Sequence, residues 1–120
     1  MRTVHLDQGV HPAEAHSVLG HAFGSVAGER LTIETGSLNA EWGGLGRSAP
    51  GSEARIIGEP YVLVDEDTIE GEIIVSDARY LKHDLRLPVV LKRQPEGRRI
   101  VDFLCDVEVA QRDYRCMKQQ

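Results

Sequence analysis

A carboxylate and a phenol stand two positions apart in a β-rich stretch of the chain, at Glu59 and Tyr61. Residues two apart on a strand point to the same face. A carboxylate in an apolar setting beside a hydrogen-bond donor is suited to general acid or base catalysis. The pair is therefore a candidate catalytic site, in which Glu59 transfers the proton and Tyr61 donates a hydrogen bond.

The direction in which Glu59 points depends on the hairpin around the acidic loop 65–67. If Thr68 lies outside the loop, Glu59 is on the core face and the Tyr61 ring lies over Gly71, because a one-residue slip exchanges the two faces. If Thr68 lies inside the loop, Glu59 points to water. The second register buries more apolar area and desolvates no charge, so we favour it by about a few kcal/mol.

A second candidate lies in the irregular, glycine-rich segment 36–54, where the single tryptophan, Trp42, is followed by Gly-Gly-Leu-Gly and Arg47. Glycines beside a basic residue suggest a phosphate loop, but the spacing fits neither GxGxxG nor a P-loop lysine. We expect Trp42 to close the end of the core. The alternative is a ligand-covering loop that uses Trp42 and Arg47.

Neither the cysteines nor the histidines form a recognisable metal or catalytic motif. Cys105 and Cys116 lie outside any CxxC pattern, and His11, His16 and His21 are spaced five apart, which turns successive rings through about 140° on a helix. We therefore predict no metal and no cofactor. A disulfide between the two cysteines stays open, although free thiols are the expectation in a reducing cytoplasm.

Length and composition indicate one globular domain over 1–120. The chain has 120 residues, 41% hydrophobic and 28% charged, with no apolar leader and no run long enough to cross a bilayer. We therefore expect a cytoplasmic protein that does not enter membranes.

The net charge of −5 argues against nucleic acid as a partner, because phosphate neutralisation needs a basic surplus. Charge is also divided along the chain, with a net −9 over 1–78 and +4 over 79–120. We expect the basic residues from Arg79 to Arg99 to pair with the acidic stretch 65–72 of the same molecule.

The elements that would position these residues are one helix and a sheet. Apolar residues at three-and-four spacing predict an amphipathic helix over 13–27, in which Gly20, Gly24 and Gly28 form a ridge for close approach of the sheet or of a partner helix. Alternation predicts strands over 31–35, 55–64, 68–76, 85–93 and 99–109, a helical turn over 37–42, and a frayed tail over 110–120. The predicted fold is α+β, with one main N-terminal helix on a curved, mostly antiparallel sheet of four to five strands.

The segment Leu87–Phe103 resembles the closing hairpin of nuclear-transport-factor-2-like domains, in which an apolar strand, a glycine-bearing turn and an Ile-Val-Asp-Phe strand follow one another. The resemblance implies a sheet wrapped on N-terminal helices with a pocket between them. The chain offers one such helix, so a simpler cystatin-like arrangement competes. No catalytic position transfers, because the core face of this hairpin is apolar.

The sequence therefore predicts a non-catalytic binding or protein-interaction module, with Trp42, Arg47, Gly20 and Gly24 as candidate contact residues. The partner would be a protein or a small apolar molecule, and a homodimer through a sheet edge or the glycine ridge is a further expectation. The alternative is a pocket enzyme of the isomerase or dehydratase kind that uses Glu59 and Tyr61.

Overall fold

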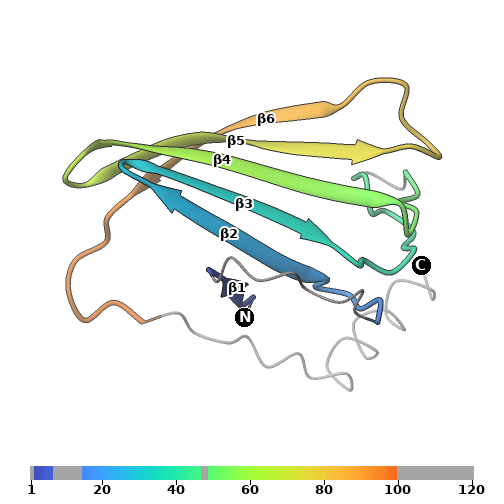
Figure 1. Ribbon diagram of the computed structural model, residues 1–120, viewed down its shortest axis with the longest axis horizontal. Coiled ribbons are helices and arrows are strands. Elements are labelled where there is room, and N and C mark those ends of the chain that lie inside the picture. Colours follow the sequence, from blue (N-terminus) through green and yellow to red (C-terminus); the bar gives the residue numbers. More distant parts are fainter. Residues whose placement is uncertain (1, 7–14, 47–48, 100–120) are drawn as a thin grey trace, which may run out of the picture.

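The computed structural model describes residues 2–6, 15–46 and 49–99. Within these residues the chain forms one six-stranded sheet and no helix, with the strands side by side in chain order (Figure 1). The parallel pair β1–β2 stands at one edge, and all other neighbours are antiparallel. The strands are β1 (Val4–His5), β2 (His21–Ala27), β3 (Arg30–Gly36), β4 (Arg55–Asp65), β5 (Thr68–Asp77) and β6 (Leu85–Lys92).

The α+β prediction is wrong, because the described part of the predicted helix contains strand β2 instead. Ala22, Gly24 and Val26 fit a two-residue period as well as a helical one, and in β2 they face Thr35, Ile33 and Leu31 of β3. Glycines weaken a helix interior by about 1 kcal/mol each relative to alanine. Gly28 has a φ of 61°, which suits the tight turn that joins β2 to β3.

The predicted strands from residue 31 to residue 93 are confirmed as β3 to β6, whereas the strand over 99–109 and both cysteines lie outside the described residues, Arg99 apart. The helical turn over 37–42 is wrong. Ser37 has a left-handed φ of 52°, and Leu38 bridges to Ser17. Gly97, in the turn that follows β6, has a left-handed φ of 85°.

The favoured register of the β4–β5 hairpin is also wrong. Tyr61 pairs with Gly71, and Glu59 is only 5% exposed, so the carboxylate lies on the core face. A two-residue turn and a bulge between Leu63 and Asp65 produce this register. Burial of Glu59 was expected to be unfavourable because no partner for its charge was considered. In the folded chain, Arg2 and Tyr61 both donate hydrogen bonds to it.

We call this side of the sheet the inner face. A compact core lies on it, made of Ala22, Ile33 and Tyr61, and Val4 and Leu31 pack against its rim. Apolar side chains of β6 are exposed on both faces of the sheet, namely Leu85, Leu87, Val90 and Leu91. The core is therefore small, and it is concentrated where β1 meets the inner face.

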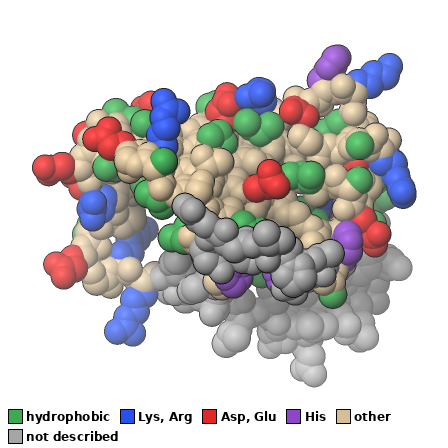
Figure 2. Space-filling model, viewed as in Figure 1, with side chains coloured by type: hydrophobic (Ala, Val, Ile, Leu, Met, Phe, Trp, Pro, Cys, Tyr) green, Lys and Arg blue, Asp and Glu red, His purple; other side chains and the backbone are tan. Residues whose placement is uncertain are grey.

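On the face seen in Figure 2, charged and apolar groups of the described residues are interspersed, without one large patch of a single sign. The expected pairing between the basic and acidic stretches is confirmed at Arg86 with Glu72 and at Arg93 with Asp67, both at 2.9 Å. Both pairs are exposed to solvent, where an ion pair contributes at most about 1 kcal/mol.

Candidate functional site

Glu59 is a buried charged side chain on the inner face that is held by three hydrogen bonds. Both guanidinium nitrogens Nη1 and Nη2 of Arg2 donate to its two oxygens, the second at 3.1 Å, and the Tyr61 hydroxyl donates to Oε1 at 2.9 Å. Charge-assisted, two-point contacts of this kind are stronger and more specific than single neutral hydrogen bonds. The carboxylate is thus a built receptor for a guanidinium group.

Tyr61 is fixed beside Glu59 by the sheet. Its ring occupies the space over Gly71, where a Cβ would approach Tyr61 Cδ1 and the carbonyl oxygen of Pro60 too closely. Burial, the hydrogen bond to Glu59 and the negative charge of that carboxylate raise the pKa of Tyr61 to about 12. The hydroxyl therefore keeps its proton at neutral pH and acts as a hydrogen-bond donor.

Arg2 comes from the segment that contains β1, 57 residues away from Glu59 in the sequence. Strands β1 and β4 are three strand spacings apart, about 14 Å in a flat sheet. The Arg2–Glu59 hydrogen bonds therefore connect the start of the chain to a strand that is not its neighbour in the sheet. The hydrogen bond to Glu59 raises the pKa of Arg2 further above its usual range, so the guanidinium stays charged.

The same segment makes two apolar contacts with β2. An added Cβ at Gly24 would lie 3.0 Å from Val4 Cγ1 and 2.9 Å from Leu6 Cδ2, so these side chains would have to shift to make room for it. Val4 pairs with the buried Ala22 and packs against the core. We call the receiving residues Ala22, Gly24, Glu59 and Tyr61 the β1 site, and residues 2–6 its occupant.

The arrangement favours recognition over catalysis. Both oxygens of Glu59 already accept hydrogen bonds, three in all from Arg2 and Tyr61, and the side chain is only 6% exposed. A general base needs a lone pair within reach of a substrate proton. Arg2, Tyr61 and burial together leave a substrate little access to this carboxylate.

The structure brings together only some of the sequence-predicted site residues. Glu59, Tyr61 and Gly24 meet at the β1 site, and Gly20 lies just before β2 with a φ of 63°. The close approach expected at the glycines is present at Gly24, but it comes from the N-terminal segment and occurs on a strand. Trp42 is 77% exposed, so the prediction that it closes the core is wrong, and Arg47 lies outside the described residues.

Sequence reasoning missed a second buried polar group, at the end of β5. Asp77 accepts hydrogen bonds from the Ser52 amide and hydroxyl, both at 2.7 Å, and from the amides of Arg79 and Tyr80. Burial by itself would raise the pKa of Asp77, but the hydrogen bonds from Ser52, Arg79 and Tyr80 lower it. With its oxygens occupied by backbone and hydroxyl donors, Asp77 fastens the irregular segment to the end of β5.

Two glycines of the glycine-rich segment 36–54 make room for a buried arginine, Arg55, which pairs with Asp77 in the sheet. The guanidinium of the buried Arg55 lies between Gly44 and Gly51, and a side chain at either glycine would overlap it. Glu41 approaches this guanidinium to 3.8 Å. These glycines thus accommodate an internal cation, which explains their clustering without a phosphate ligand.

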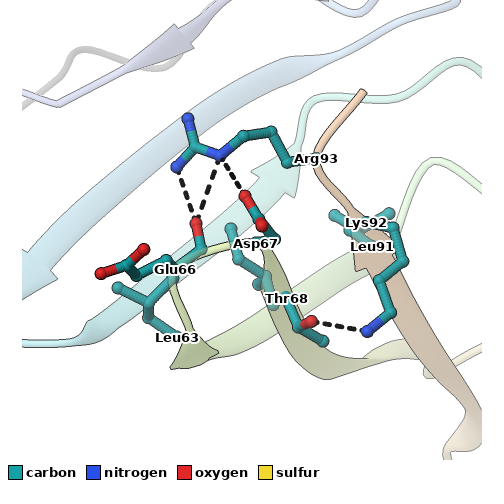
Figure 3. Close-up of a pocket in the computed structure, with 8 residues that line it drawn as sticks. Leu63, Glu66, Asp67, Thr68, Leu91, Lys92 and Arg93 are labelled. Atoms are coloured by element: carbon teal, nitrogen blue, oxygen red, sulfur yellow. Dashed lines mark hydrogen bonds and ion pairs between the residues drawn. The ribbon is translucent and has the colours of Figure 1, made fainter. Parts of the chain in front are cut away.

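A cavity of about 300 Å³ lies at the tips of the hairpins (Figure 3). Leu63, Ile69 and Leu91 contribute apolar lining. The two cations at its rim are engaged within the chain, since Lys92 donates to Thr68 and Arg93 pairs with Asp67. The cavity has room for a small apolar group, but its cations are not directed toward an anionic ligand.

Across residues 2–6, 15–46 and 49–99, no group of three or more His, Cys, Asp or Glu side chains is arranged to hold a metal ion. The same residues contain no helix that is long and apolar enough to cross a membrane. No family model, curated protein or solved structure matches the chain. The resemblance of its closing hairpin to nuclear-transport-factor-2-like domains therefore stays a prediction from sequence, and the β1 site must be interpreted from its own geometry.

Proposed function

We propose that this protein is a non-catalytic interaction module that binds an extended peptide strand at the β1 site. The single observation that carries the proposal is the two-point contact between Arg2 and the buried Glu59. It supplies the specificity that main-chain pairing along β2 does not supply, because main-chain hydrogen bonds are indifferent to side-chain identity.

The ligand class follows from the contacts of the occupant. Arg2 forms hydrogen bonds with Glu59. The aliphatic side chains two and four positions later, Val4 and Leu6, lie over Gly24. The intervening residues, Thr3 and His5, point to the other side of an extended strand. The site is therefore suited to a peptide with the pattern arginine, any residue, aliphatic, any residue, aliphatic.

The pocket-enzyme alternative receives less support. It requires Glu59 to exchange a proton with a substrate, yet the carboxylate accepts hydrogen bonds from Arg2 and Tyr61 on both oxygens. A substrate would have to compete with Arg2 and Tyr61 for this carboxylate before Glu59 could act as a base.

The test uses a peptide with the sequence of residues 1–8, labelled with a fluorophore at its C-terminus, and the full chain. In one variant, Arg2→Ala removes the side chain that binds Glu59, and Val4→Asp places a charge in the contact with Gly24. We call this double substitution the released variant. A Glu72→Gln substitution in the released variant serves as the control, since Glu72 forms the exposed pair with Arg86.

Fluorescence anisotropy should show that the peptide binds the released variant at least tenfold more tightly than the unsubstituted chain, because the internal strand competes in the latter. The control should bind like the released variant. A peptide with the same residues in scrambled order should bind neither. Equal, weak binding of both peptides to a released variant that retains its sheet by circular dichroism would overturn the proposal.

A further inference from the structure

We infer that the strand bound at the β1 site can come from a second copy of this chain, so that two molecules exchange residues 2–6. This inference rests on the proposed function. It adds the identity of the partner, which the peptide experiment alone does not determine.

The receiving half of the contact belongs to the antiparallel part of the sheet. Glu59 and Tyr61 are buried in β4, which has antiparallel neighbours on both sides, and Ala22 is buried in β2. Gly71 leaves room for the Tyr61 ring, and Gly24 leaves room for Val4 and Leu6. The site is thus shaped by strands β2 to β5, independently of which molecule supplies the occupant.

Residues 2–6 are held by the specific contact between Arg2 and Glu59 more than by burial of their side chains. Only Val4 and His5 of this segment are in register with β2, the side chain of Arg2 is 37% exposed, and Leu6 is exposed as well. A surface cavity of about 190 Å³ lies beside this segment, lined by Arg2, Thr3 and His5 together with residues 19–22. Segments with few buried contacts are those that open at the lowest free-energy cost.

A second copy is the partner that matches every observed contact. Its residues 2–6 carry the same arginine and the same aliphatic side chains, so reciprocal exchange would form each contact again without loss. Exchange of an identical element is a low-cost route to a symmetric dimer. A short connection gives the internal strand an effective concentration on the order of millimolar, so exchange in the unsubstituted chain should grow as the protein concentration approaches that range.

Complementary variants test this inference. The released variant has an intact β1 site and a defective strand. Glu59→Gln has an intact strand and a defective site. Sedimentation velocity should show that each is monomeric alone at about 20 µM and that an equimolar mixture forms a one-to-one complex, because a single productive pairing is regained. A mixture of the released variant with the released variant that also carries Glu59→Gln is the matched negative control.

The unsubstituted chain provides a second measurement that needs no folded variant. Its dimer fraction should rise between about 20 µM and 1 mM, and an excess of the free residue 1–8 peptide should return it to monomer. Peptide binding without a mixed complex would overturn the second copy as partner and leave the proposed function standing. Absence of both peptide binding and a mixed complex would overturn both. A dimer that the peptide does not dissociate would refute strand exchange as its cause.

Discussion

Replacing Glu59 by glutamine removes the charge that holds Arg2 while keeping an oxygen that can accept from Tyr61. Hydrogen bonds to charged groups contribute about 1.5–3 kcal/mol each in net terms. Because the Arg2 side chain is 37% exposed, its guanidinium regains water when the contact is lost, so the lower value applies. We expect a local loss of about 1.5 kcal/mol, which corresponds to roughly a tenfold change in the equilibrium between attached and detached β1.

Amide hydrogen exchange measures this equilibrium directly. In Glu59→Gln, the amides of Val4 and His5 and those facing them in β2 should exchange about tenfold faster, while those of the β4–β5 pair should change little. Glu72→Gln is the matched control, because it breaks an Arg–Glu pair in which both side chains are exposed. Its effect should stay below about 0.5 kcal/mol. The reasoning is refuted if Glu59→Gln leaves β1 protection unchanged, or if both substitutions alter it equally.

Three further predictions concern Gly24, Tyr61 and Asp77. Gly24→Ala should lower the exchange protection of β1, because the added methyl group forces Val4 and Leu6 to shift, whereas Gly58→Ala, with its nearest contact at 3.9 Å, should not. Equal effects of the two substitutions would contradict the close packing of β1 at Gly24. In an ultraviolet titration, one tyrosine should ionise near pH 12, and this step should be absent in Tyr61→Phe. Because the folded pKa is raised, the contribution of Tyr61 to stability should be full below about pH 10 and fall as the pH rises toward 12. A titration that Tyr61→Phe leaves unaltered would be inconsistent with this. Asp77→Ala should lower the free energy of unfolding in urea by about 3 kcal/mol, because its hydrogen bonds are lost. It should also reduce the loss of stability below about pH 4, because the folded pKa of Asp77 is lowered. A loss under about 1 kcal/mol would show that its hydrogen bonds to Ser52 are dispensable.

Much of the sheet could be predicted from the sequence because its signals are local. Alternating apolar residues and turn residues place β3 to β6 within about two residues of their observed ends. The pairing of Arg86 and Arg93 with the acidic stretch followed from the division of charge along the chain.

The helix prediction failed because apolar residues between Ala15 and Val26 fit two periods at once. Gly20, Gly24 and Gly28 carried the deciding information, since interior glycines penalise a helix. Two of them have positive φ at the ends of β2, and the third admits the N-terminal segment.

The β1 site could be predicted only in part, because Arg2 and Glu59 are 57 residues apart in the sequence. Glu59 and Tyr61 were identifiable from their spacing on one strand. Nothing local marks Arg2 as their partner, and without Arg2 a buried Glu59 looked unfavourable. The parallel pairing of β1 with β2 creates the contact, and parallel pairing depends on crossover connections that alternation does not reveal.

The most direct test of strand recognition is the energetic coupling between the peptide arginine and Glu59. Four dissociation constants define it: the residue 1–8 peptide and its Arg2→Ala form, each titrated into the released variant with and without Glu59→Gln. Recognition predicts that the arginine improves binding about tenfold when Glu59 is present and less than twofold when it is glutamine. An equal benefit from the arginine in both backgrounds would contradict the assignment of Glu59 as its receptor.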